Sequence, residues 1–330
     1  MIITRTPFRI SLAGGGSDLP SFYQRHEGCV LSTSINQYMH IVIHPTFHRN
    51  ETVVKYNKTE TVTDVRQIHH PIARQLLLDH GISGVEIVST ADIPSGTGLS
   101  TSSAYTVGLI HALYAFQGKF CSQERIAKEA CELEIDKLGE PIGKQDQYGT
   151  AVGGLKFIRF KPDGSVEVEP LTISTEVYHQ LDESLLLFYT GLTHSAGEIL
   201  KEQNANTVSD DAKFQNLVRM TELAYEMRQS LATADLDGFG QILNENWLLK
   251  RQLASGISNP TVEHYYQLAM DSGALGGKLL GAGGGGFLLF YCPKQKQARL
   301  RSVLSDLVEL PFHMEGSGTK VIYVGEKNWD

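Results

Sequence analysis

The sequence predicts an α+β fold of two lobes. Three observations support this expectation. The length of 330 residues suits two average domains. Strand-like and helix-like segments are intermixed in both halves, and a long helical stretch lies within the second half. Hydrophobic residues make up 41% and charged residues 20% of the chain, which is an ordinary globular composition and excludes a disordered protein.

The first half of the chain alternates between β-branched runs, which predict strands, and apolar positions at helical spacing, which predict helices. A loop over Ala91–Ser102 and a short turn at Asn36-Gln37 interrupt these segments. The expected strands are Thr4–Leu12, Val30–Ile35, Tyr38–His44, Val85–Thr90, Leu155–Phe160 and Val166–Val168. The expected helices are Pro71–His80, which Gly81 would end, Ser103–Phe116 and Ser122–Leu138.

The second half begins with a mostly helical pattern and returns to strands near its end. The expected helices lie near 195–204, 209–234, 236–253 and 260–271. They are followed by strands Gly277–Leu280 and Phe287–Tyr291, a helix Lys294–Leu307 and a last strand Lys320–Val324. We place the boundary between the lobes near residues 180–195 and assign 1–185 to an N-terminal domain and 186–330 to a C-terminal domain.

The net charge, the apolar runs and the cysteines indicate which partners and which cellular location to expect for this protein. A net charge of -8 repels phosphate backbones, so we expect no nucleic-acid partner. The longest apolar runs fall far short of the ~20 residues that cross a bilayer, and the first ten residues lack the apolar core of a signal peptide. The four cysteines have neither metal-site nor disulfide spacing, which predicts a cytoplasmic protein.

Many of the 32 glycines fall in three clusters. The first cluster is Gly14, Gly15, Gly16, Ser17 and Asp18, which ends a predicted strand. Three glycines allow a ligand to approach the backbone closely, and they equally suit a plain tight turn. From the residues alone, both interpretations stay open.

The second cluster joins a predicted strand to a predicted helix. It consists of Pro94, Ser95, Gly96, Thr97, Gly98, Leu99, Ser100, Thr101, Ser102 and Ser103. Glycines that wrap an anion, hydroxyl donors and the positive end of a helix dipole together predict a phosphate-binding loop. The loop lacks the Gly-Lys-Ser/Thr ending of a Walker A motif. The alternative is a long helix cap, although a cap needs a single hydroxyl residue.

The third cluster, Gly281–Gly286, matches the GxGxxG pattern of dinucleotide-binding proteins in its letters. That pattern must open a helix, whereas Phe287–Tyr291 predicts a strand. We therefore expect a hairpin loop that packs its backbone against another loop or a ligand.

Two carboxylates are candidates for chemistry. Glu134 has apolar neighbours three and four positions away on its helix, so its charge would need a metal, a cation or a buried salt bridge. Glu132 has charged neighbours at those positions, so we expect it in water. Asp146 lies between Gly143 and Gly149 and could act in catalysis or cap a helix. Lys144, two residues away, could hold Asp146 ionised or bind a phosphate itself.

Together these segments resemble the GHMP kinases, the family of galactokinase, homoserine kinase, mevalonate kinase and phosphomevalonate kinase. The second cluster is similar to the family's phosphate loop with one additional hydroxyl residue. The third cluster is similar to its C-terminal glycine motif, and Arg5–Pro20 to its N-terminal substrate motif. The strings RTPFRISLAGGGSDLPSFY, ELEIDKLGEPIGKQDQYG and KLLGAGGGGF most resemble the D-glycero-D-manno-heptose 7-phosphate kinases within the family.

The resemblance implies an N-terminal lobe like domain 2 of ribosomal protein S5, a ferredoxin-like C-terminal lobe and an active site between them. It implies that residues 94–103 bind ATP, and that Glu134 with Thr101 or Ser102 binds Mg²⁺. Asp146 would be the catalytic aspartate, with Arg9 near the attacking hydroxyl, while Lys144 could add positive charge. The substrate-binding residues would be Arg9, Gly14, Gly15, Gly16, Ser17, Asp18, Gly283 and Gly284.

The implied activity is ATP- and Mg²⁺-dependent phosphorylation of the anomeric hydroxyl of a sugar phosphate, namely D-glycero-D-manno-heptose 7-phosphate. Galactokinases carry Glu-His where this chain has Gly15-Gly16, which argues against galactose. Lys144, Lys278 and the Lys250-Arg251 pair could hold the second phosphate. The alternatives are a kinase of a free sugar such as fucose, a nucleotide-dependent oxidoreductase and a non-catalytic binding module. A monomer and a homodimer both stay open.

Overall fold

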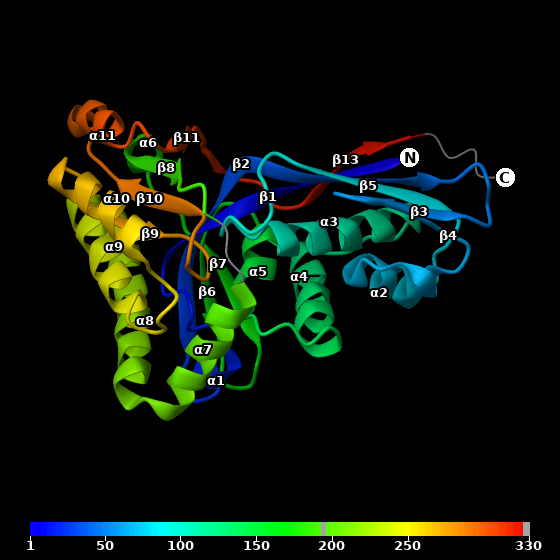
Figure 1. Ribbon diagram of the computed structural model, residues 1–330, viewed down its shortest axis with the longest axis horizontal. Coiled ribbons are helices and arrows are strands. Elements are labelled where there is room, and N and C mark those ends of the chain that lie inside the picture. Colours follow the sequence, from blue (N-terminus) through cyan, green and yellow to red (C-terminus); the bar gives the residue numbers. More distant parts are fainter. Residues whose placement is uncertain (193–195, 326–330) are drawn as a thin grey trace.

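Two β-sheets organise the chain in the computed structural model, which describes residues 1–192 and 196–325. One sheet has nine strands and the other has four. In Figure 1 the long strands of the larger sheet run from the centre to the right, and the smaller sheet lies on the left among helices. The predicted α+β mixture is confirmed.

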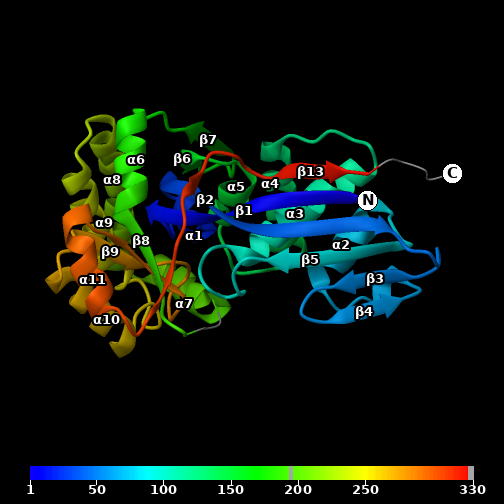
Figure 2. The ribbon, with the colours of Figure 1, turned by 90° about the horizontal axis from the view of Figure 1, so that it is seen from above.

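The larger sheet has a main path of six strands and a branch from its longest strand. The path runs β13 (Lys320–Val324), β1 (Ile2–Ala13), β2 (Gly28–Pro45), β5 (Val85–Ala91), β3 (Thr52–Lys55) and β4 (Thr59–Val62). The branch consists of β6 (Leu155–Phe160), β7 (Val166–Pro170) and β12 (Met314–Glu315). β3 and β5 pair in parallel, whereas the other pairs are antiparallel. Figure 2 shows β13 beside β1.

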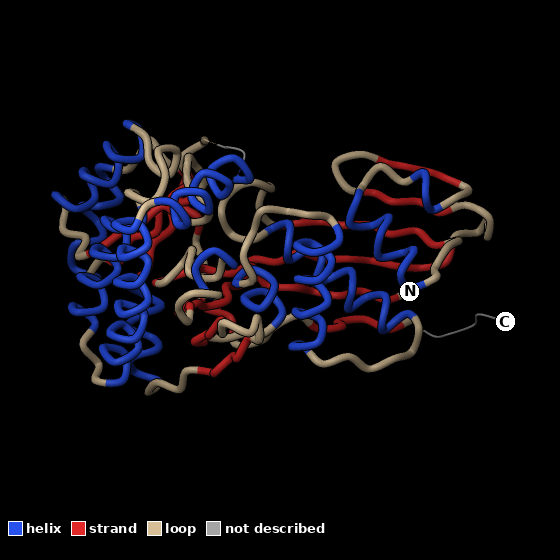
Figure 3. The backbone as a smooth tube through the Cα atoms, turned by 90° about the horizontal axis from the view of Figure 1, so that it is seen from below, coloured by secondary structure: helices blue, strands red, loops and turns tan. Residues whose placement is uncertain are grey.

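Helices cover one face of the larger sheet, as Figures 1 and 3 show. They are α2 (Pro71–His80), α3 (Thr101–Phe116), α4 (Gln123–Cys131) and α5 (Gln145–Ala151). α3 lies at the centre and contacts β1, β2, α4 and α5. Most of its residues are buried, which explains why its apolar residues do not form a single stripe. Shorter pieces are α1 (Pro20–Tyr23), a 3₁₀ turn at Val65–Gln67 and a π-helix at Glu132–Lys137.

The smaller sheet belongs to the helical part of the chain. Its strands are β11 (Val308–Leu310), β8 (Leu185–Tyr189), β10 (Phe287–Tyr291) and β9 (Gly276–Leu279), in that order. The helices of this part are α6 (Thr175–Ser184), α7 (Ala196–Ser209), α8 (Asp211–Ala232), α9 (Leu236–Lys250), α10 (Pro260–Asp271) and α11 (Gln297–Val303), with a 3₁₀ turn at Lys294–Lys296. Trp247, Phe188 and Phe290 are buried in its core.

The turn expected at Asn36-Gln37 is wrong, because β2 runs through these residues without a break. Pro7 pairs with Tyr38 and Phe8 with Ile35, so Asn36 and Gln37 form a bulge opposite β1. The backbone N–H of Asn36 donates to the His313 carbonyl, which satisfies the bulged residue from another segment.

Several other boundaries differ from expectation. The helix predicted over Ser122–Leu138 is α4 followed by the π-helix, in which the Leu138 N–H donates to the Leu133 carbonyl. The helix predicted over Lys294–Leu307 already ends at Val303. Ser195, the expected start of the first helix in the second half, lies outside the described residues. The elements that were not predicted are α1, β3, β4, the 3₁₀ turn at Val65–Gln67, α5, α6, β8, β11 and β12.

The division of the chain into domains at 185/186 stays a prediction. The smaller sheet begins with β8 at Leu185, which lies at that boundary. The last two strands, β12 and β13, return to the larger sheet. Within the described ranges, no helix has the length and hydropathy of a membrane span.

Candidate active site

The loop between β5 and α3 places uncapped backbone N–H groups at the start of a long helix. Ser100 occupies the N-cap of α3 with a left-handed backbone, φ 65°, and its side chain caps no N–H group. Gly96 and Gly98 also have left-handed φ values, 75° and 85°. The Ser100 hydroxyl is buried and has no hydrogen-bond partner among the described residues. Free N–H groups, an unpaired hydroxyl and a helix dipole suit an anionic ligand.

The third glycine cluster packs directly on this loop. A Cβ atom on Gly98 would lie 2.5 Å from the Leu280 carbonyl oxygen, and one on Gly281 would lie 2.5 Å from the Gly98 Cα atom. The Phe287 N–H also donates to the Thr97 carbonyl at 3.3 Å. The predicted contact between two loop backbones is therefore confirmed. Because β10 follows the cluster, the dinucleotide-binding interpretation fails.

Arg9 and Asp146 form an ion pair beside the loop. Arg9 is on β1, and its Nε and Nη2 atoms donate to Asp146 Oδ1 at 2.9 and 2.6 Å. Its Nη1 atom donates to the Gly98 carbonyl at 2.9 Å. The Arg9 side chain is 3% exposed and the Asp146 side chain 30%, so the carboxylate faces outward from a buried guanidinium. Gly149 leaves room for Arg9, because a Cβ there would lie 3.0 Å from Arg9 Cγ.

Asp18 connects the first glycine cluster to α5, the helix that also holds Asp146. Its Oδ1 atom accepts the Gly16 N–H at 3.0 Å, and its Oδ2 atom accepts the Gln145 N–H at 3.1 Å. Burial raises the pKa of Asp18, and the nearby charge of Asp146 raises it further. A ligand that brings positive charge or hydrogen-bond donors to this carboxylate would stabilise its ionised form.

Glu134 projects from the π-helix into a polar pocket. Its carboxylate accepts hydrogen bonds from Ser103 at 2.9 Å, from Thr106 at 2.6 Å and from Gln147. Glu134 is 2% exposed, and burial raises its pKa although the three donors act in the opposite direction. Glu132 is exposed, as predicted. Among the described residues, no lysine, arginine or histidine forms an ion pair with Glu134, so the buried salt bridge is not formed.

The donor set around Glu134 suits Mg²⁺, which prefers oxygen ligands. The Gln147 Oε1 atom is buried beside the carboxylate without a partner in the described part of the chain. The hydroxyls that contact Glu134 are those of Ser103 and Thr106, which lie three positions apart on the face of α3 that points to Glu134. Binding of Mg²⁺ by the hydroxyl of Thr101 or Ser102 stays a prediction.

Lys144 and Arg251, two of the basic residues expected to bind phosphate, have other partners in the structure. The Lys144 ammonium donates to the Gly164 carbonyl at 2.6 Å and lies over the Tyr23 ring, so Arg9 and not Lys144 holds Asp146. Arg251 pairs with Glu263 at 2.7 Å. The catalytic role of Lys144 stays a prediction.

Lys250 and Lys278 are both buried, 6% and 1% exposed. Lys278 donates to the Ser11 and Leu12 carbonyls beside the first glycine cluster. Gly283 and Gly284 pack on Ile257. Their contact with a sugar also stays a prediction.

Sequence reasoning missed Gln147 and Asn246. Gln147 became visible only with α5, a helix that the glycine-bracketed segment did not predict. Asn246 accepts the Gly14 N–H at 3.0 Å and lies four residues before Lys250 on α9. This spacing was no signal, because Asp237, Gln241 and Glu245 have the same spacing on α9 and are exposed.

Comparison with known proteins identifies the family. The model of the GHMP kinases N terminal domain matches residues 66–154, and that of the GHMP kinases C terminal domain matches residues 227–309. The chain is also 30% identical to D-glycero-alpha-D-manno-heptose 7-phosphate kinase of Campylobacter jejuni, over 99% of this chain and 98% of that protein. The chain belongs to the GHMP kinase family.

Two further similarities describe this GHMP kinase. The bifunctional fucokinase/GDP-fucose pyrophosphorylase of Arabidopsis thaliana is 28% identical over 92% of this chain, which spans 31% of that protein. The crystal structure of a D-glycero-D-manno-heptose 1-phosphate kinase from Bacteroides thetaiotaomicron superimposes with a TM-score of 0.82 at 22% identity, over 99% of this chain and 100% of that chain. The predicted GHMP kinase fold and the predicted enzyme class, a phosphotransferase with an alcohol acceptor, are confirmed.

Proposed function

We propose that this GHMP kinase transfers the γ-phosphoryl group of ATP to the anomeric hydroxyl of D-glycero-D-manno-heptose 7-phosphate, which gives the 1,7-bisphosphate. The choice of this acceptor rests on the similarity to a heptose 7-phosphate kinase over almost the whole length of both chains. The buried ammonium of Lys278 beside the first glycine cluster, in a protein of net charge -8, supports an acceptor that is itself an anion.

The donor side of the proposed site is residues 94–103. Uncapped N–H groups at the start of α3 would bind the phosphates of ATP. Mg²⁺ would be held by Glu134 with the hydroxyl of Thr101, Ser102 or Ser103. Bound there, the ion would neutralise charge on the phosphates.

The acceptor side is built on Asp146. Its partly exposed carboxylate would accept the proton of the anomeric hydroxyl as the new oxygen–phosphorus bond forms. Arg9 fixes the carboxylate through two nitrogens and also contacts the donor loop at Gly98, so it sets the distance between the two reactants. Asp18 and the glycines beside it would bind the sugar hydroxyls, and the short Gly15-Gly16 leaves space for the sugar.

The test compares kcat/KM for heptose 7-phosphate and for the unphosphorylated heptose at fixed Mg-ATP, with the product located by phosphorus NMR. We expect the 7-phosphate to be used at least tenfold better, a difference of about 1.4 kcal/mol, and the new phosphate to be on the anomeric oxygen. Equal use of the free sugar, or phosphate on another oxygen, would overturn the acceptor proposal.

A kinase of a free sugar such as fucose is the second candidate, because the bifunctional fucokinase matches 92% of this chain. L-Fucose therefore belongs in the same acceptor panel. Turnover of fucose above that of heptose 7-phosphate would favour this candidate. We also propose a cytoplasmic location, since the four cysteines are free and buried.

A further inference from the structure

Lys250 is a buried cation that the helical part of the chain, which holds the smaller sheet, contributes to the site. It is the last residue of α9, and its ammonium donates to the Gly281 carbonyl at 2.5 Å. Asn246, one turn earlier on the same face, accepts the Gly14 N–H. This face of α9 therefore contacts the third glycine cluster through Lys250 and the first through Asn246, one turn apart.

The position of Lys250 follows from a chain of direct contacts. Gly281, which accepts its hydrogen bond, packs on Gly98 of the phosphate loop. The Gly98 carbonyl accepts from Arg9, and Arg9 holds Asp146. Lys250 thus lies where the donor loop meets the proposed base.

The ammonium of Lys250 has unused binding capacity. It carries three N–H donors, and the structure gives it one hydrogen-bond acceptor among the described residues, a neutral carbonyl. Burial lowers its pKa to about 8 and the positive charge of Arg9 contributes, whereas the carboxylates of Asp18 and Asp146 act in the opposite direction. A buried cation in such surroundings is stabilised when an anion arrives.

We infer that Lys250 is a catalytic residue that binds the phosphoryl group during its transfer from ATP to the acceptor. The inference rests on the proposed function, in which residues 94–103 hold ATP and Asp146 faces the acceptor hydroxyl. As the acceptor oxygen bonds to the γ-phosphorus, the bond to the β,γ-bridging oxygen breaks. The hydroxyl proton passes to Asp146, and Lys250 stays protonated throughout.

The same geometry separates this role from binding of the acceptor's own phosphate. In a heptose 7-phosphate, that phosphate is at the opposite end of the sugar from the anomeric hydroxyl. Lys250 lies at the reacting end, next to the donor loop, so its charge acts on the oxygens that change charge during transfer.

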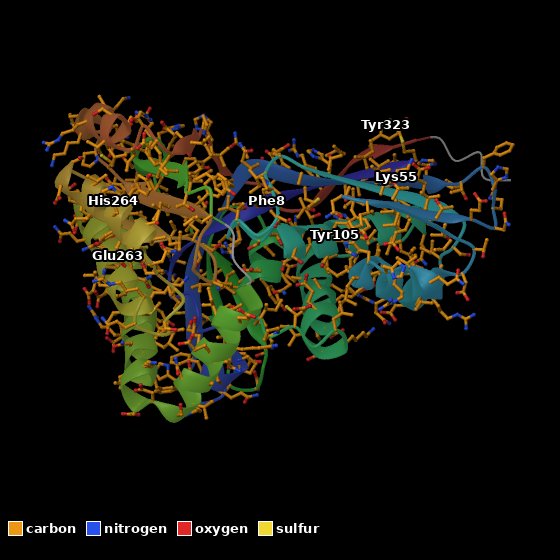
Figure 4. The ribbon with its side chains drawn as sticks, in the orientation of Figure 1. Phe8, Lys55, Tyr105, Glu263, His264 and Tyr323 are labelled. Atoms are coloured by element: carbon orange, nitrogen blue, oxygen red, sulfur yellow. The ribbon has the colours of Figure 1, made fainter. Side chains whose placement is uncertain are left out.

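The test uses Lys250→Met and Lys250→Arg, with Arg251→Met as the matched control. Arg251 is the next residue, yet it is a third exposed and pairs with Glu263. In Figure 4, Glu263 lies among the helices at the left, whereas Phe8 of β1 lies near the centre. We expect Lys250→Met to lower kcat by roughly 10²–10³-fold, Lys250→Arg to retain part of the activity, and Arg251→Met to leave kcat within about twofold.

A binding measurement separates catalysis from support of the loops. We expect the wild type to bind MgADP with aluminium fluoride, a mimic of the transferring phosphoryl group, more tightly than MgADP alone. Lys250→Met should lose this difference and keep its affinity for MgADP. An equal loss of affinity for both, or a kcat equal to that of Arg251→Met, would overturn the inference.

The pH profile gives a third readout. The charged groups around Lys250 are Arg9, Asp18, Asp146 and Lys278. We expect kcat/KM of the wild type to fall above pH about 8, and the fall to move to higher pH in Lys250→Arg, whose guanidinium keeps its proton. If kcat/KM of Lys250→Arg falls at the same pH as that of the wild type, the titrating group is Lys278 and the inference is contradicted.

Failure of the Lys250 inference can be distinguished from failure of the proposed acceptor. All rate ratios are measured with whichever sugar the wild type phosphorylates, so a wrong acceptor overturns the proposed function alone. Binding of MgADP with aluminium fluoride requires no turnover and tests Lys250 independently.

Discussion

At the scale of single residues, the central contact joins Arg9 to Asp146 across 137 positions of sequence. Arg9 is buried on a central strand, while Asp146 belongs to the first turn of a short helix. The pair is held from one side only, because both donors of Arg9 reach the same carboxylate oxygen. The other oxygen, Oδ2, is therefore available to a substrate.

Replacement of Asp146 by Asn tests that available oxygen. The amide keeps the shape and loses the charge and the basicity, so we expect kcat to fall by roughly 10²–10⁴-fold. ATP should still bind with nearly unchanged affinity, which calorimetry would measure. Turnover close to that of the wild type in the folded variant would remove Asp146 from the mechanism.

Glu134 and Glu132 form a controlled pair within one turn of the π-helix. Glu134→Gln removes a buried carboxylate that has only neutral donors around it, and we expect the Mg²⁺ concentration for half-maximal activity to rise by roughly 10–100-fold. Glu132→Gln changes an exposed side chain near Lys128, so its Mg²⁺ dependence should match the wild type. Identical Mg²⁺ titrations of the two variants would contradict the proposed metal ligand.

At the scale of elements, the close contact between the phosphate loop and the third glycine cluster depends on Gly98. A Cβ there would meet the Leu280 carbonyl oxygen at 2.5 Å, whereas nothing lies within 4 Å of a Cβ at Gly96. Both glycines have left-handed backbones, so alanine costs about 1–2 kcal/mol of backbone strain at either position.

We therefore expect Gly98→Ala to lower the unfolding temperature clearly more than Gly96→Ala. The additional decrease of the unfolding temperature in Gly98→Ala would come from displacement of the phosphate loop from the third glycine cluster. It should be accompanied by a higher KM for ATP. Thermal unfolding of the two variants measures the difference. Equal unfolding temperatures would show that the two loops separate easily.

The elements that sequence predicted best have strong local patterns. α2 begins at Pro71 and ends before Gly81 as predicted, because proline and glycine set both of its ends. α5 was missed because it has seven residues and its ends carry no side-chain cap. The bulge at Asn36-Gln37 was missed because its partner, His313, is far away in sequence.

In the candidate site, too, the features that depend on local sequence were predicted and those that depend on packing were not. The phosphate loop, Asp146 and the burial of Glu134 could be inferred from spacing and resemblance, since each depends on neighbours in the chain. The pairing of Asp146 with Arg9 instead of Lys144, and of Glu134 with Ser103, depends on how separate elements pack. No local pattern carries that information.

At the scale of the whole molecule, this acidic protein buries three lysines within residues 1–192 and 196–325, namely Lys156, Lys250 and Lys278. Lys156 is fully buried on β6, where it donates to the Ser34 hydroxyl at 3.1 Å and the Gly154 carbonyl at 3.0 Å. Burial lowers its pKa from 10.5 to about 7, with a further contribution from Arg9. The unfolded chain therefore binds more protons at this residue than the folded one above pH 7.

This difference predicts the direction of a pH effect on stability. Where the unfolded state binds more protons, the free energy of unfolding rises with pH, so Lys156 contributes a rise from pH about 7, its folded pKa, to about 10.5, its unfolded pKa. Lys156→Met should flatten the rise, as measured by urea unfolding at several pH values. A slope unchanged in the variant would show that Lys156 remains charged in the folded protein.

The pairing of β13 with β1 has a consequence for the order of events during synthesis. Ile2–Arg5 of β1 pair on one side with Lys320–Val324 of β13, so this part of β1 leaves the ribosome long before its partner strand is synthesised. Until then its outer N–H and C=O groups form an open edge that can pair with other nascent chains. Contacts between such distant residues also form slowly. We therefore expect the growing chain to depend on chaperones until β13 has emerged.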